Sequence, residues 1–137
     1  KISRSIRRIK NEEMAGFNLK SPHVSCLYYL YKENNKITAK ELCDICEEDK
    51  AAISRSIEFL EKNGYVECSS RTEKKYRAPL SLTSKGVEIG KIIVKKIDDI
   101  VDIASNGLTD DDRKVFYKSL IMISDNLQKF CNDYKED

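Results

Sequence analysis

The sequence has none of the features that mark a membrane protein, a secreted disulfide scaffold or a common class of enzyme. Its 137 residues contain no apolar run of about eighteen residues, and the basic N-terminus has no apolar signal-peptide core. Five irregularly spaced cysteines favour a reducing cytoplasm over a disulfide framework. A single histidine, with no Gly-rich phosphate loop and no nucleophile elbow, argues against an enzyme, and we expect no metal or cofactor.

Charge is unevenly distributed along the chain, although its formal net value is only +2. Residues 98–137 contain ten acidic and five basic side chains, so the rest of the chain carries +7. This split predicts a basic, phosphate-binding body and an acidic C-terminal helix. Ordinary solvated surface would give the same split, so the charge distribution alone does not identify a phosphate-binding protein.

A helical pattern begins at Thr38, where Thr38 and Glu41 have the spacing of a capping box. Leu42, Ile45 and Cys46 are predicted to form the buried face of this short helix. A three-residue turn over 47–49 follows it. The length of the chain suits one compact domain with helical extensions.

The next helix is predicted over residues 50–63, because Asp49 can cap its start and Gly64 is a typical left-handed stop. Ile53, Ile57 and Leu60 are its apolar positions, and small and polar residues occupy the opposite side. Two helices joined by a short turn in this way form a helix-turn-helix.

Alternating strand patterns at 65–68 and 80–83 follow, with a basic segment between them that contains Lys74, Lys75 and Arg77. Pro79 is confined to an edge position because it cannot donate to a ladder. The predicted fold class is therefore mainly α with a small β-wing: a winged helix-turn-helix with additional terminal helices.

Both ends of the chain carry apolar stripes at helical spacing. In the N-terminal helix Ile2, Ile6 and Ile9 share one stripe, and the next helix is predicted to be capped by Ser21. In the last helix, which begins after Thr109, the stripe consists of Phe116, Leu120, Ile123, Leu127, Phe130 and Tyr134. We expect a homodimer, with dimerisation helices at 1–20 and 105–137, a DNA-binding lobe at 21–85 and a connecting helix at 86–104. The alternative is that these stripes pack only within the chain.

Four segments in this order resemble the MarR family of bacterial transcription regulators: ITAKEL (37–42), DKAAISR (49–55), LEKNGYV (60–66) and LTSKG (82–86). The resemblance extends over nearly the whole chain. It implies an obligate homodimer on a pseudo-palindromic operator in double-stranded DNA. Family members usually repress transcription, and a small, often aromatic or phenolic molecule, or an oxidant, releases them. The family's wing Asp and Arg fall on Lys74 and Tyr76 here, so their usual role cannot be assigned to these positions.

The helix at 50–63 is the predicted reader of the major groove. Ala51 and Ala52 allow a close approach, Ser54 can bond a phosphate or base edge, and Arg55 can bind guanine O6 and N7. The alternative for Arg55 is a surface salt bridge with Glu58 or Glu61. Phosphate contacts would set the register. The predicted DNA-binding residues are Thr38, Lys50, Ala51, Ala52, Ser54, Arg55, Lys74, Lys75 and Arg77.

Regulation leaves weaker signals in the sequence. Cys43 and Cys46 form a C-x-x-C, but one helix holds both, and no second such pair exists, so we interpret them as buried small hydrophobes. Cys26, Cys68 and Cys131 are far apart in sequence, and any one of them could be an oxidant sensor.

By the resemblance, His23, Cys26 and Tyr28 lie near the cleft where relatives bind effectors, so they are the predicted effector-binding residues. For His23, an ordinary surface position is the alternative. A winged helix that contacts only other proteins is the alternative function for the whole chain.

Overall fold

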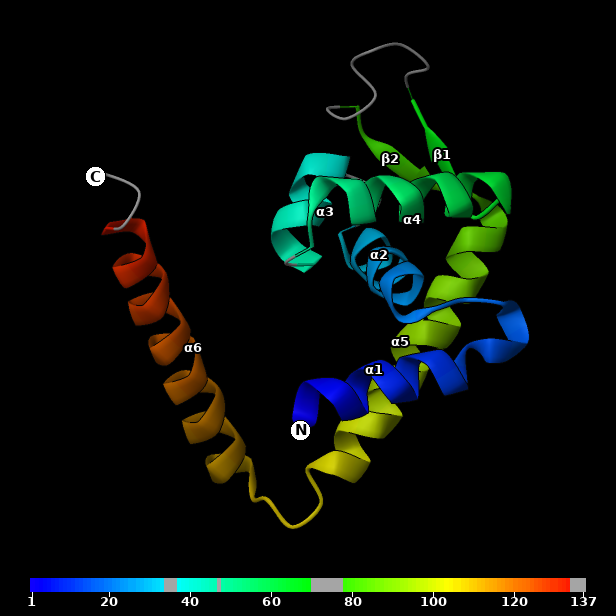
Figure 1. The fold of residues 1–137 in the computed structure, drawn as a ribbon. Coiled ribbons are helices and arrows are strands. Elements are labelled where there is room, and N and C mark those ends of the chain that lie inside the picture. Colours follow the sequence, from blue (N-terminus) through cyan, green and yellow to red (C-terminus); the bar gives the residue numbers. More distant parts are fainter. Residues whose placement is uncertain (34–36, 47, 70–77, 134–137) are drawn as a thin grey trace. The chain divides into compact units, whose positions relative to one another are not determined.

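The computed structural model describes residues 1–33, 37–46, 48–69 and 78–133 (Figure 1). The chain forms two compact units, Lys1–Asp98 and Asp99–Asp137. Its elements are α1 (Ile2–Glu13), the 3-10 helix η1 (Ala15–Phe17), α2 (Ser21–Lys32), α3 (Ala39–Cys46), α4 (Lys50–Lys62), β1 (Val66–Cys68), β2 (Leu80–Leu82), α5 (Ser84–Ala104) and α6 (Asp110–Asp133). None of the described helices is long and apolar enough to cross a lipid bilayer. This content of helices and one small sheet confirms the predicted fold class.

The core of the first unit lies where α2, α3 and α4 pack on one another. Leu27 of α2, Leu42 of α3 and Leu60 of α4 are each 0% exposed, and Ile93 of α5 packs into the same cluster. Burying each of these side chains stabilises the fold by about 1.5–3 kcal/mol. The two helices of the helix-turn-helix, α3 and α4, are therefore held in place by buried contacts with α2 and α5.

This core begins earlier in the chain than the lobe predicted at 21–85. Met14 and Leu19 are each 2% exposed and belong to the same cluster, although they lie in the segment assigned to dimerisation. The stripe of α1 itself faces solvent, with Ile2 77% and Ile6 47% exposed. The segment 1–20 thus combines an anchored C-terminal end with an unburied apolar face.

Two details predicted for these helices are wrong. Ile45 is 39% exposed, because the buried stripe of α3 passes through Ala39 and Leu42, and Ile45 lies about a quarter of a turn from the midline of that stripe. Ser21 is not the cap of α2 but its first residue. The chain enters α2 through Lys20, whose backbone N–H donates to Nδ1 of His23 at 3.1 Å.

The wing is an antiparallel pair in which Val66 faces Leu82 and Cys68 faces Leu80. An isolated bridge between Thr38 and Pro79 adds a short third segment on the other side of β2. Pro79 sits at the start of the pairing, as its missing N–H requires. The segment before α3 is thereby tied to the sheet, which lies beside α4 in Figure 1.

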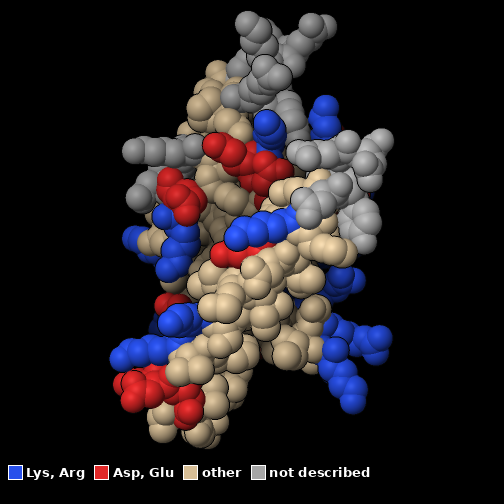
Figure 2. Space-filling model, turned by 90° about the vertical axis from the view of Figure 1, so that its left-hand side faces the viewer, with Lys and Arg blue, Asp and Glu red and all other residues tan. Residues whose placement is uncertain are grey.

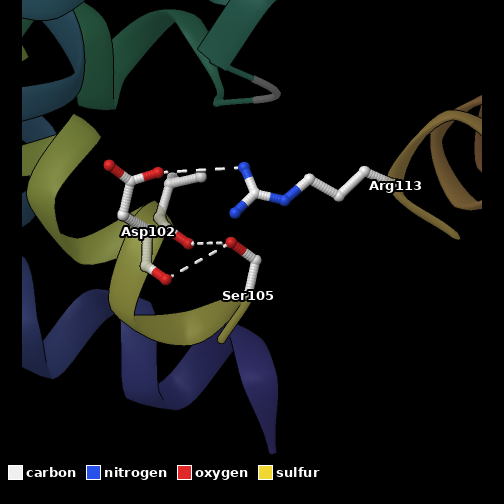
Figure 3. A network of polar contacts seen from close by, with 4 residues as sticks. Asp102, Ser105 and Arg113 are labelled. Carbon is white, nitrogen blue, oxygen red and sulfur yellow. Dashed lines mark hydrogen bonds and ion pairs between the residues drawn. The ribbon is translucent and has the colours of Figure 1, made fainter. Parts of the chain in front are cut away.

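The second unit contains the last turns of α5 and the whole of α6. Thr109 and Asp112 form a capping box: the Thr109 N–H donates to Asp112 at 3.0 Å, and the Asp112 N–H donates back to Thr109 Oγ1 at 3.1 Å. Figure 3 shows Arg113 reaching back toward Asp102, 3.8 Å away, next to Ser105. This cluster marks the end of α5, and Gly107, three residues after its last residue Ala104, takes a φ of 90°.

Candidate nucleic-acid interface

One side of α4 is turned to solvent and carries the residues predicted to read DNA. Lys50, Ala51, Ser54 and Arg55 are exposed, and Ala52 is half-buried. The opposite side is buried through Ile53 (1% exposed), Ile57 (5%) and Leu60 (0%). The apolar spacing holds α4 on the core, and the same spacing leaves its small and polar residues outside.

Both ends of α4 are closed by the residues that the sequence indicates. Asp49 accepts a hydrogen bond from the Ala52 N–H at 2.7 Å, as a side-chain N-cap. Gly64 has a φ of 73°, and the Tyr65 N–H bonds the Leu60 carbonyl at 2.9 Å in a Schellman arrangement. Because both ends are capped, all thirteen residues of α4 form one defined helix whose outer side can contact a partner.

Arg55 is the most distinctive side chain on this surface. No hydrogen bond or ion pair joins its guanidinium to another residue in the part of the chain that the structure describes, so the proposed pairing with Glu58 or Glu61 is not observed. A guanidinium presents five donors in a fixed fork. On a solvent-facing helix those donors are available to a ligand.

Thr38 is occupied by its own helix. Its hydroxyl donates to Glu41 Oε2 at 2.9 Å and accepts from the Glu41 N–H at 3.2 Å, and its N–H also bonds that carboxylate. The predicted capping box is therefore confirmed, and the bond to the Thr38 backbone lowers the pKa of Glu41. A DNA phosphate only accepts hydrogen bonds, so a phosphate contact from Thr38 would have to replace Glu41 as the acceptor of the Thr38 hydroxyl or N–H.

The basic residues of the wing, Lys74, Lys75 and Arg77, lie outside the described residues, and their contacts stay a prediction. The strands that carry them are described, and β1 packs against α4. Figure 2 shows both basic and acidic side chains on the face turned to the viewer, with uncharged surface between them. The geometry of α4, rather than the charge balance, identifies the candidate interface.

The three predicted effector-binding residues have different neighbours. His23 stacks on Phe59 of α4, with ring centroids 4.0 Å apart, and burial together with the charge of Lys20 lowers its pKa. Cys26 is 0% exposed and contacts Cys46 of α3, whereas Tyr28 lies edge-on to Tyr29 at 5.2 Å. His23 thus has a clear structural function in joining α2 to α4. The effector site stays a prediction.

The contact between Cys26 and Cys46 is a feature that sequence spacing did not reveal. Spacing drew attention to Cys43 and Cys46, which both pack against the core as partly buried side chains. Twenty residues separate Cys26 from Cys46, so only the packing of α2 on α3 brings them together. No group of three or more potential metal ligands occurs within the described ranges.

Comparison with known proteins identifies the same architecture. Residues 23–101 match the family described as winged helix DNA-binding domain. An uncharacterized HTH-type transcriptional regulator of Bacillus subtilis is 22% identical over 128 residues, which cover 93% of this chain and 85% of that protein.

Two solved structures are similar over most of both chains. The crystal structure of MarR is 28% identical with a TM-score of 0.77, and the match covers 96% of this chain and 89% of that one. A MarR family regulator from Listeria monocytogenes, solved with 26mer DNA, is 26% identical with a TM-score of 0.81, over 92% of this chain and 83% of that one.

Proposed function

The chain belongs to the winged helix DNA-binding domain family, within the MarR group of transcription regulators, and we propose that it is a homodimeric repressor of a pseudo-palindromic operator. The observation that carries the proposal is the outer side of α4. There a capped helix presents to solvent small side chains and an arginine that forms no ion pair with any described residue, in a fold that a relative uses on 26mer DNA.

In this proposal α4 enters the major groove. Ala51 and Ala52 let the helix axis come close to the base edges, and their methyl groups can meet thymine methyls. Arg55 binds a guanine through O6 and N7, and Ser54 bonds a phosphate or base edge. Lys50 lies at the first turn of α4, where a cation suits a phosphate that fixes register without reading sequence.

The remaining DNA contacts are phosphate contacts. Thr38 stands at the N-terminus of α3, where backbone N–H groups already favour an anion. Lys74, Lys75 and Arg77 of the wing would reach phosphates or a narrow minor groove. These contacts set total affinity and salt dependence, because each neutralised phosphate releases counterions.

The unburied apolar side of α6 supports the homodimer. Its stripe includes Phe116, Leu120, Ile123, Leu127 and Phe130, all 50–59% exposed in the single chain. A seam of this length is far larger than the isolated apolar residues of a normal surface, and a second copy can cover it. The exposed stripe of α1 would contribute from the other end of the chain.

A small aromatic or phenolic effector would regulate the dimer by preferring one spacing of its two lobes over the other. Such a ligand needs only a difference in affinity between a DNA-competent and a DNA-incompetent arrangement. His23, Cys26 and Tyr28 on α2 remain the proposed contacts.

Fluorescence anisotropy with the DNA upstream of the protein's own gene and with a scrambled duplex, over a KCl series, tests this function. We expect tight, salt-dependent binding with a clear preference for the upstream DNA and two protomers per site. Equal and weak binding to both duplexes at every salt concentration would reject a sequence-specific repressor. It would favour a winged helix that contacts other proteins.

The dimer has a separate test by light scattering. Leu120→Glu places a charge in the α6 stripe and should yield a monomer, whereas Lys118→Glu changes charge on the same helix, off the stripe, and should leave the dimer intact. A dimer that survives Leu120→Glu would mean that α6 does not form the interface.

A further inference from the structure

The chain contains two Asn-Gly dipeptides, Asn63-Gly64 directly after α4 and Asn106-Gly107 between α5 and α6. An asparagine before a glycine can modify itself, because no side chain on the glycine hinders attack of its nitrogen on the asparagine side-chain carbonyl. Both asparagines are exposed. A Cβ built on either glycine would meet no atom within 4 Å, so neither site is crowded. Exposure and crowding therefore do not distinguish the two dipeptides.

Hydrogen bonds restrain the first dipeptide at the end of α4. Asn63 Nδ2 donates to the Phe59 carbonyl at 2.8 Å, which holds the side-chain amide against the preceding turn of the helix. The Gly64 N–H donates to the Glu61 carbonyl at 3.0 Å, so the nitrogen that would have to attack is already bonded. The Asn63 carbonyl oxygen also accepts a hydrogen bond from Lys85 Nζ at 2.9 Å. A reaction at Asn63 therefore requires the C-terminal end of α4 to open.

The second dipeptide lacks these restraints. Its turn is closed by the Leu108 N–H, which donates to the Ser105 carbonyl at 3.0 Å, and the Asn106 N–H donates to the Ile103 carbonyl at 3.2 Å. Figure 3 shows the Ser105 hydroxyl turned back onto α5, where it bonds carbonyl oxygens of the last turn. The Asn106 side chain and the Gly107 N–H make no hydrogen bond to any described residue. Both reacting groups of Asn106-Gly107 are therefore available to each other.

We propose that Asn106-Gly107 is a self-modification site at which the folded chain deamidates, while the fold protects Asn63-Gly64. A base from solvent removes the Gly107 N–H proton, and the nitrogen attacks Cγ of Asn106. The new N–C bond forms as the bond from Cγ to the side-chain nitrogen breaks, and that nitrogen takes up a proton and leaves as ammonia. Water then opens the resulting succinimide ring at one of its carbonyl groups. The products are aspartate, with an ordinary main chain, and isoaspartate, in which the main chain passes through the former side chain.

Either product places a new carboxylate just after α5. The last carbonyl groups of a helix carry partial negative charge, so an anion beyond Ala104 is unfavourable. Asp102 in the last turn of α5 and Asp110 at the start of α6 already carry negative charge nearby in sequence. The isoaspartyl product also lengthens the main chain of the turn. The modification should therefore loosen the last turn of α5; any further effect on the homodimer rests on the proposed function, whereas the reaction does not.

Peptide mapping of the full folded chain tests the site. The protein is incubated in mildly alkaline buffer, and trypsin then releases Asn63 in peptide 63–71 and Asn106 in peptide 97–113. An unincubated sample measures the deamidation caused by digestion, and isoaspartyl methyltransferase labels the isoaspartate. We expect aspartate and isoaspartate to accumulate at Asn106, and to form about tenfold more slowly at Asn63, where hydrogen bonds must open first. Equal rates at the two sites, a faster reaction at Asn63, or an unmodified Asn106 would overturn the proposal.

Unfolding shows whether the fold causes this selectivity. In concentrated urea the hydrogen bonds around Asn63 are lost, so the two rates should converge. Selectivity that persists in urea would mean that the neighbouring residues in the sequence, rather than the fold, set the difference. The rate at Asn106 should also rise with pH, because the reaction begins with removal of a proton, and a rate independent of pH would contradict this mechanism.

Substitution isolates the site. Asn106→Gln should stop the reaction there, because attack on a glutamine side chain must close a larger ring. Asn63→Gln is the matched control and should leave the rate at Asn106 unchanged. Continued release of ammonia at the wild-type rate from Asn106→Gln would place the reaction elsewhere and overturn the proposal.

Amide hydrogen exchange tests the consequence for α5. Exchange over residues 99–104 should be faster in incubated than in fresh wild-type protein, and it should not change on incubation of Asn106→Gln. Equal exchange in incubated and fresh wild-type protein, with Asn106 shown to be modified, would overturn the effect on α5 and leave the mapping result standing.

Discussion

Arg55→Ala is the change that most directly probes α4. Arg55 is exposed and makes no hydrogen bond or ion pair within the described part of the chain, so its removal breaks no such interaction there. The free energy of unfolding should stay within about 0.5 kcal/mol of wild type, as for most surface substitutions. A loss of DNA binding in this variant can therefore be attributed to the interface.

The expected size of the effect comes from the bidentate contact. An arginine on guanine contributes about 1–3 kcal/mol of discrimination, which corresponds to about 5- to 150-fold in Kd for each recognition helix. The loss should be concentrated on the upstream DNA. Binding to a scrambled duplex should weaken much less, because the phosphate contacts remain.

Anisotropy on both duplexes at one fixed salt concentration measures this difference, and urea unfolding checks the fold. Lys91→Ala is the matched control: it also removes one exposed positive charge, but from α5. If Arg55→Ala weakened binding to both duplexes equally, Arg55 would be a phosphate contact, and the proposed base reading would be wrong.

Three further predictions concern the scaffold. Asp49→Ala should reduce the free energy of unfolding in urea by about 1 kcal/mol through loss of the α4 cap, whereas Asp49→Asn, which can still cap, should change it little. Gly86→Ala should destabilise the protein by about 1–3 kcal/mol or more, because the new Cβ would lie 2.0 Å from the Tyr65 carbonyl oxygen. Gly16→Ala is the control, since a Cβ there would have nothing within 4 Å. Equal thermal stability of the two variants would contradict this packing. Burial lowers the pKa of His23 below its ordinary 6.5, so the unfolded chain binds a proton at His23 more readily than the folded chain does. The contribution of neutral His23 to the free energy of unfolding is therefore complete above pH 6.5 and declines as the pH falls toward the folded pKa. A flatter dependence of stability on pH in His23→Gln would confirm this assignment.

The sequence by itself determined most of the local structure, and the start of α2 is the exception. The caps at Thr38 and Asp49 and the stop at Gly64 stand where the sequence placed them. Each depends on residues only a few positions apart, so the pattern of side chains is sufficient to predict it. The outer side of α4 was predictable for the same reason, since buried apolar spacing leaves the remaining positions exposed.

Packing between elements was decided only by the tertiary structure. The stripe of α3 excludes Ile45, His23 stacks on Phe59, and Cys26 meets Cys46 across twenty residues of sequence. Such contacts depend on how far each helix is rotated about its axis and on which neighbour it meets, and no periodic pattern within one helix encodes either. The helices and the surface for DNA could therefore be predicted from the order of the residues, whereas the thiol pair between α2 and α3 arises from the way those helices pack.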